Sequence, residues 1–238
     1  MSRATPAVRR AILFDLDDTL YPSNQFRCSG FAAVACHLEE AYHLDAETVR
    51  ASLVSSSRGP ERGRELQVCA RQFGLPPSIV GELVEVIRGH EPTLTLPRIT
   101  AAALSALRPS WALGVVTNGP PDVQARKVAA LGIDRFVDCV VYAQAHGSGT
   151  GKPDREPFLE ALRRLAVPAD RTVFVGDDDY SDVFGASRVG MHTVLMAAWN
   201  LQPRGRPVRA DTVVVNLRDL PRLAERLLDR VARRRHVA

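Results

Sequence analysis

The sequence predicts an α/β fold in which a doubly wound, mainly parallel sheet is interrupted after its first strand by an all-helical insertion. Two observations predict this fold. Beyond Pro97, short apolar segments alternate with segments of helical periodicity, a pattern typical of right-handed βαβ units. Between residues 24 and 91 the periodicity is helical throughout. The 238 residues, 45% of them hydrophobic, suffice for one large core with a smaller insertion.

The expected strands are short and apolar. The first covers residues 11–16 and ends directly in carboxylates. Further strands are expected at Ala112–Thr117, Val137–Tyr142, Thr172–Gly176, His192–Met196 and Thr212–Val215. Helices are expected to begin near Pro97, Pro121, Asp154, Asp182 and Arg218. The predicted core therefore consists of residues 1–22 and 95–238.

The insertion, residues 23–94, is expected to contain helices alone. Asn24 and Asp45 suit helix N-caps because their short polar side chains accept hydrogen bonds from the first free amides of a helix. Tyr21-Pro22 is expected to mark a hinge where the chain leaves the core.

Charge and hydropathy exclude several classes of protein. The net charge is +4, and residues 218–235 alone carry this excess. Four apolar residues recur there at helical spacing, which favours an amphipathic helix packed on the core over a nucleic-acid patch: Leu220, Leu223, Leu227 and Val231. No apolar run is long enough for a membrane span or a signal peptide. We expect a cytoplasmic protein that binds neither nucleic acid nor membrane.

Lysine is rare in this chain. Of the 31 basic residues, only Lys127 and Lys152 are lysines. A site that needs a compact point charge does not accept arginine in its place, so a lysine in such a chain is informative. The four cysteines form no C-x-x-C pair, and we expect free thiols.

Polar residues collect where the expected strands end. In open parallel sheets, ligands bind beyond the carboxyl ends of the strands. These positions hold Asp15, Asp17, Thr117, Asn118, Asp177, Asp178 and Asp182, and Lys152 precedes a helix on the same side. Clustered carboxylates repel one another unless a cation is present, and all-oxygen ligands favour Mg²⁺. An isolated Asp-Asp-Thr would suit a simple turn, but the other strand ends supply what a site needs.

These motifs resemble those of the haloacid dehalogenase-like hydrolases. The run Phe14-Asp15-Leu16-Asp17-Asp18-Thr19-Leu20 resembles the first motif of that family and Thr117-Asn118 the second. Lys152-Pro153 resembles the third motif, and Gly176-Asp177 with Asp182 the fourth. The insertion falls where the family carries a C1-type cap. The resemblance implies a Rossmann-like core with a helical cap domain.

The resemblance also implies catalytic roles. Asp15 would be the nucleophile that forms an aspartyl-phosphate, and Asp17 the general acid and then the base. Thr117 would bind the phosphoryl oxygens with help from Asn118, and Lys152 would neutralise charge. Mg²⁺ would be held by four residues, Asp17 through its backbone carbonyl and Asp182 less directly: Asp15, Asp17, Asp177 and Asp182.

We therefore expect a Mg²⁺-dependent phosphomonoester hydrolase that acts on a small phosphorylated metabolite and is a monomer or a homodimer. Three alternatives stay open. A 2-haloacid dehalogenase needs neither a metal nor an acid at position 17. A sugar phosphomutase needs a proton relay in its cap, and none is identified between residues 24 and 91. A non-catalytic binding protein would be expected to lack part of the catalytic set. The sequence does not identify the phosphate ester.

Overall fold

The structure, a computed structural model, describes residues 10–199 and 209–235. The chain forms two compact units, one of residues 1–22 and 95–238 and one of residues 23–94. The first unit carries the sheet and is called the core unit below. The second contains only helices among its elements and is called the helical unit.

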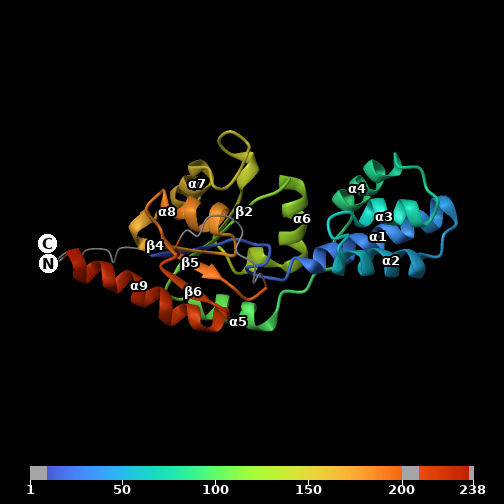
Figure 1. The fold of residues 1–238 in the computed structure, drawn as a ribbon. Helices are drawn as coiled ribbons and strands as arrows, with labels where there is room; N and C mark the ends of the chain where they lie inside the picture. Colours follow the sequence, from blue (N-terminus) through green and yellow to red (C-terminus); the bar gives the residue numbers. More distant parts are fainter. Residues whose placement is uncertain (1–9, 200–208, 236–238) are drawn as a thin grey trace. The chain divides into compact units, whose positions relative to one another are not determined.

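The core unit is built on a six-stranded parallel sheet in the order β3-β2-β1-β4-β5-β6 (Figure 1). The strands are β1 Ala11–Phe14, β2 Ala112–Thr117, β3 Cys139–Tyr142, β4 Thr172–Gly176, β5 His192–Met196 and β6 Thr212–Val214. The chain proceeds outward from β1 to β3 and then outward again from β4 to β6. The strand order therefore reverses between β1 and β4, where open α/β sheets bind ligands.

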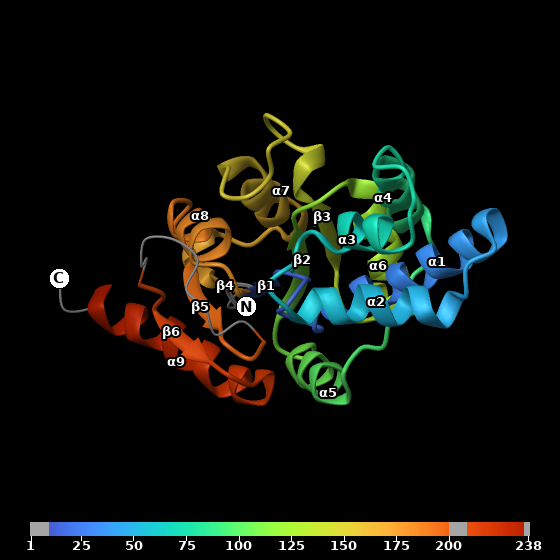
Figure 2. The ribbon, with the colours of Figure 1, turned by 45° about the vertical axis from the view of Figure 1, so that its right-hand side comes forward.

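Helices cover both faces of this sheet, as Figures 1 and 2 show. Helices α7 and α8 lie on one face, while α5 and α9 pack together on the other. The helices are α5 Arg98–Leu107, α6 Pro121–Leu131, α7 Arg155–Leu165, α8 Gly185–Ser187 and α9 Leu220–Arg235. Short turns of helix occur at Ile133–Arg135, Ala143–Ala145, Ala169–Arg171, Asp179–Phe184 and Leu217–Asp219. This arrangement confirms the predicted α/β class.

The apolar residues of the strands and helices form the core. All four residues of β1 are completely buried, and Phe158 of α7 packs edge-on against Phe174 of β4. In α9, Leu220 and Leu227 are buried, as the packed-helix interpretation requires. The side chain of Val231, which belongs to the same predicted stripe, lies outside the described residues.

The helical unit consists of α1 Asn24–Tyr42, α2 Ala46–Arg58, α3 Glu65–Gln72 and α4 Ile79–Gly89. Asp45 caps α2 as predicted, because its side chain accepts from Thr48 N at 2.7 Å. The prediction for Asn24 was wrong, since α1 begins at Asn24 itself and Ser23 precedes it. The unit has its own apolar cluster, which includes Leu38, Leu53 and Leu83. Within the described ranges, none of the helices has the length and hydropathy of a membrane span.

Several element boundaries differ from the prediction. β3 begins at Cys139 and not at Val137, and β6 ends at Val214 and not at Val215. β1 ends at Phe14 rather than at residue 16, because the chain turns there and Asp18 N bonds to Tyr21 O. The helical turn after β4 begins at Asp179 and not at Asp182. Its start is fixed by Asp178, whose Oδ1 accepts from Tyr180 N and Ser181 N. Asp182 therefore lies inside a helical turn.

Candidate active site

Asp15 lies at the reversal point of the sheet. Its backbone N donates to Val175 O at 2.9 Å, which extends the pairing of β1 with β4 one residue beyond the strand. This contact holds the buried Asp15 side chain at the carboxyl end of the sheet. The last residue of β4 is Gly176, so Asp177 emerges at the same edge.

Lys152 contacts Asp15 from the segment before α7. Its Nζ lies 2.5 Å from Asp15 Oδ1 and 2.7 Å from Asp182 Oδ1, and all three side chains are buried. Burial by itself lowers the pKa of Lys152, but the two carboxylates outweigh burial and raise it above its ordinary value. The ammonium is therefore kept charged next to one oxygen of Asp15.

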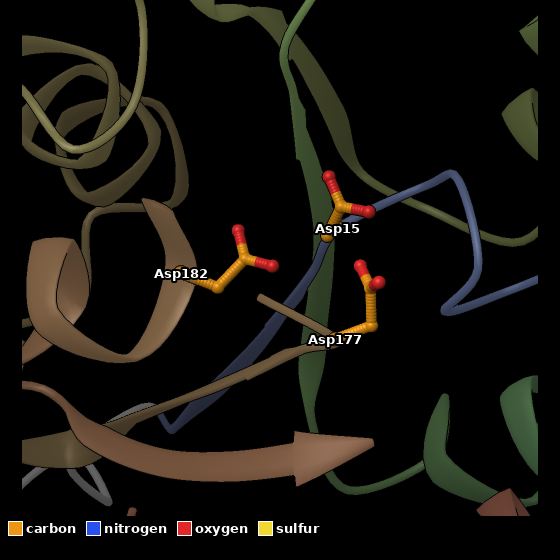
Figure 3. Close-up of side chains that lie close together, drawn as sticks. All are labelled: Asp15, Asp177 and Asp182. Carbon is orange, nitrogen blue, oxygen red and sulfur yellow. The ribbon is translucent and has the colours of Figure 1, made fainter. Parts of the chain in front are cut away.

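Three carboxylates, shown in Figure 3, converge on one another. Two of them, Asp15 and Asp182, contact the Lys152 ammonium. Asp15, Asp177 and Asp182 each contribute an oxygen that lies within 4.8 Å of the other two. Burial raises the pKa of Asp15 well above its ordinary value, and the neighbouring carboxylates raise it further against the opposing charge of Lys152. One ammonium leaves two of the three negative charges unbalanced, and a divalent cation beside the ammonium would balance them. The all-oxygen donor set fits Mg²⁺, whose ligand oxygens lie about 2.0–2.1 Å from the metal.

The turn after β4 decides which acids face this cluster. Asp178 uses its carboxylate to cap the turn and is not one of the three converging acids. Asp182 projects from the turn back toward β4, where its Oδ2 accepts from Asp178 N at 3.1 Å. Because its Oδ1 contacts Lys152, both oxygens of Asp182 already have protein donors. Asp177, the third converging acid, is half-buried.

The Asp17 carboxylate lies among donors of the core unit. Lys127 Nζ is 2.9 Å from its Oδ1 and 2.8 Å from its Oδ2. Tyr21 donates its hydroxyl to Oδ1 at 2.6 Å, and Gln124 donates its amide to Oδ2 at 3.3 Å. Burial and the charge of Asp17 raise the pKa of Tyr21, so the phenol keeps the proton that it donates. These contacts give the Asp17 side chain a defined direction.

Thr117 and Asn118 follow one another at the end of β2. Thr117 is completely buried, and its hydroxyl lies 3.4 Å from Gln124 Oε1. The Asn118 carboxamide brackets the Lys152 main chain, accepting from its N at 2.8 Å and donating to its O at 3.0 Å. A β-carbon on Gly151, where φ is +81°, would lie 2.5 Å from Asn118 Oδ1. The Asn118 side chain therefore supports Lys152.

Comparison with known proteins identifies the family of the chain. The model of the haloacid dehalogenase-like hydrolases matches residues 9–190. The chain belongs to the haloacid dehalogenase-like hydrolases. This membership confirms the predicted family and the predicted enzyme class, a hydrolase, and the relatives described next support phosphoric monoesters as the bond type.

Two curated relatives are phosphatases. The glyceraldehyde 3-phosphate phosphatase of Methanopyrus kandleri is 32% identical over 200 residues, which is 78% of this chain and 82% of the relative. The phosphoserine phosphatase of Thermus thermophilus is 31% identical over 163 residues, or 68% of this chain and 64% of the relative. A solved structure, the 2-haloacid dehalogenase of Pseudomonas syringae, is 27% identical with a TM-score of 0.62 and covers 92% of this chain and 99% of its own.

Sequence reasoning about this hydrolase missed three residues around Asp17. Lys127 carried a signal, because it is one of only two lysines, but nothing near it in the sequence indicates a partner. Gln124 lies one helical turn earlier on the same face of α6. Tyr21 was expected only at a hinge, yet it is completely buried and contacts Asp17. The contacts of these three residues with Asp17 become visible only in the folded structure.

Gly176 makes room for Asp182. A β-carbon on Gly176 would overlap the Asp182 carboxylate and lie 2.5 Å from Asp182 Cβ. We expect Gly176→Ala to displace Asp182 from Lys152 and to lower kcat by about 10- to 100-fold, since misplacement by about 1 Å is costly at a reacting centre. Steady-state kinetics would measure this loss. Gly81→Ala in α4, where a β-carbon meets nothing within 4 Å, is the matched control. Wild-type kcat in Gly176→Ala would contradict the expectation that the contact between Asp182 and Lys152 matters for turnover.

Proposed function

We propose that this protein is a Mg²⁺-dependent phosphomonoester hydrolase that acts on a small phosphorylated metabolite through an aspartyl-phosphate intermediate. The observation that carries the proposal is the pairing of each central aspartate with a buried lysine. Asp15 contacts Lys152, and Asp17 contacts Lys127. Two carboxylates in different environments are suited to different roles in one reaction.

Asp15 is suited to act as the nucleophile. One of its oxygens contacts Lys152, and the other would attack phosphorus while the bond from phosphorus to the ester oxygen breaks. Asp17 would give a proton to the departing oxygen, which leaves as an alcohol. Positive groups around the phosphoryl oxygens stabilise the spreading negative charge. Lys152 would supply one such group. The Thr117 hydroxyl, which donates to Gln124 Oε1 at 3.4 Å, would turn to donate to a phosphoryl oxygen instead.

The second half of the reaction regenerates Asp15. Asp17, now a carboxylate, would take a proton from water while the water oxygen attacks phosphorus. The bond between phosphorus and Asp15 breaks, and inorganic phosphate leaves. A bound Mg²⁺ would supply positive charge that lets carboxylate and phosphate approach. The residues that would hold it are Asp15, Asp177, Asp182 and the Asp17 backbone carbonyl.

The substrate class follows from the relatives and from Asp17. The relatives are named for glyceraldehyde 3-phosphate and phosphoserine, both small phosphate monoesters. The similar solved structure is named as a 2-haloacid dehalogenase. Attack on a carbon–halogen bond releases halide, which needs no proton, so that reaction leaves Asp17 without its role as proton donor. We therefore favour phosphate ester hydrolysis.

A substrate panel tests this function. The purified protein with Mg²⁺ would be assayed for phosphate release from glyceraldehyde 3-phosphate, O-phosphoserine and other small phosphate esters. Halide release from 2-chloropropionate would be measured in parallel. We expect phosphate release from at least one ester and no halide. Halide release without phosphate release would overturn the proposal in favour of a dehalogenase.

Metal removal gives a second prediction. Chelation with EDTA should abolish phosphatase activity, and added Mg²⁺ should restore it, because the excess negative charge of the three carboxylates stands in the way of an anionic substrate. Binding should also stabilise the fold by about 2.7 kcal/mol at a Mg²⁺ concentration 100-fold above Kd. Melting temperatures with and without Mg²⁺ would measure this stabilisation independently of turnover. Full activity after exhaustive chelation would exclude the metal.

A further inference from the structure

Lys127 is a buried lysine on a helix face whose other buried residues, apart from Gln124, are apolar. The inward face of α6 also carries Val123, Val128 and Leu131, all buried. The Lys127 side chain is only 8% exposed. Burial of an ammonium is costly unless it is paired. The burial of Lys127 is therefore explained by its ion pair with Asp17.

The ion pair between Lys127 and Asp17 involves both oxygens of the carboxylate. Lys127 Nζ contacts both carboxylate oxygens, at 2.9 and 2.8 Å, although the two residues are 110 positions apart. An ammonium that contacts both oxygens fixes the orientation of the carboxylate plane. The chain uses arginine almost everywhere else, and the planar guanidinium is not an equivalent replacement at a confined site.

Of the other two contacts of Asp17, the one from the buried Tyr21 is short at 2.6 Å and the one from Gln124 is the least constraining. An ionised carboxylate offers about four lone-pair sites, and the two contacts from Lys127 together with those from Tyr21 and Gln124 use four. One contact must therefore yield whenever Asp17 takes up or hands over a proton. The Gln124 contact is the longest at 3.3 Å, and the Gln124 amide also donates to Asn118 O at 2.7 Å. Lys127 can thus keep its contacts with Asp17 while the hydrogen bond from Gln124 to Asp17 breaks.

We propose that Lys127 is a positioning residue that keeps the Asp17 carboxyl directed at the reacting oxygen in both halves of the reaction. The proposal rests on the proposed function, since it needs Asp17 to transfer protons. It gives Lys127 a role parallel to that of Lys152, the other lysine of the chain. Lys152 orients the nucleophile, and Lys127 orients the proton carrier. Neither the phosphoryl group nor the metal needs to touch Lys127.

The test compares two esters that differ in their need for a proton. An alkyl phosphate needs its leaving oxygen protonated, whereas 4-nitrophenyl phosphate does not. In Lys127→Met we expect kcat for the alkyl ester to fall about 10- to 100-fold, part of the 10²–10⁴-fold effect of a general acid. KM should change by less than about threefold. The loss for the aryl ester should be several-fold smaller, and Lys127→Arg should recover part of the alkyl activity.

A double-mutant cycle separates this role from a merely structural one. If Lys127 acts through Asp17, adding Lys127→Met to Asp17→Asn should slow the aryl ester no further, because coupled residues are not additive. Removing both members of a buried pair is also milder than removing one, so the double variant keeps the test valid should Lys127→Met alone not fold. Arg163→Met, which breaks an exposed ion pair on α7, is the matched control and should leave kcat unchanged.

The possible outcomes separate the two proposals. An active wild type in which Lys127→Met slows both esters equally, or slows Asp17→Asn by a further large factor, would overturn the positioning role alone. Unchanged kcat in Lys127→Met would do the same. A folded wild type that releases phosphate from neither ester in the presence of Mg²⁺ would instead overturn the proposed function.

Discussion

Asp17→Asn should lose about 10²- to 10⁴-fold in kcat for alkyl phosphates while its first step with an activated aryl phosphate is slowed far less. The range is that of general acid–base catalysis. Asparagine has no proton to give to an alkoxide leaving group, but a nitrophenolate leaves without one. Asparagine still accepts contacts from Tyr21 and Lys127 through its carbonyl oxygen. Steady-state kinetics with both esters would measure the difference.

The same variant should accumulate phosphorylated Asp15. Once the aryl phosphate has transferred its phosphoryl group, no base remains at position 17 to take a proton from water. A burst of one nitrophenolate per protein and an acid-labile phosphorylated peptide that contains Asp15 are the expected signatures. Asp122→Asn, at an exposed position of α6, is the matched control and should show neither. Equal losses for both esters with no trapped species would remove Asp17 from proton transfer.

Asp15→Asn should abolish turnover of both esters and form no covalent species. The carboxamide cannot form the mixed anhydride that the mechanism requires, so we expect a fall in kcat of at least about 10⁴-fold, within the range known for lost nucleophiles. Mass spectrometry of the intact protein after exposure to the aryl ester would detect any phosphoryl adduct. An adduct in Asp15→Asn would place the nucleophile elsewhere.

Asp15→Asn should also stabilise the metal-free protein. The pKa of Asp15 is raised in the folded state by burial and neighbouring carboxylates. A carboxyl group with a raised folded pKa lowers stability progressively as pH rises above its unfolded pKa, so the ionised residue costs stability at pH 7. Lys152 keeps Asp182 as a partner in the variant. We expect a higher melting temperature without Mg²⁺ and a smaller gain on adding Mg²⁺. A lower metal-free melting temperature would mean that the Asp15–Lys152 pair stabilises the fold.

The sequence by itself determined the fold class and the chemical character of the strand ends. Strands such as β2 and β4 are legible because their residues are all buried and the runs end in polar groups. Asp15 and Asp177 could be placed at one edge because parallel strands present their carboxyl ends together. These features depend on local pattern and on general rules of chain connection. The resemblance to a hydrolase family followed from the same short motifs.

Only the tertiary structure decided which side chains touch. The sequence placed Asp177, Asp178 and Asp182 after one strand, and the family resemblance implied metal binding by Asp177 and, less directly, Asp182. In the structure, Asp178 caps the turn, which separates it from the other two. The contact between Lys127 and Asp17 joins residues 110 positions apart, and no periodicity or spacing encodes it. Side-chain partners depend on how a helix is rotated against the sheet, which is set by the packing of the whole core. Lys127 is unusual in the sequence, but its partner is decided by the folded chain.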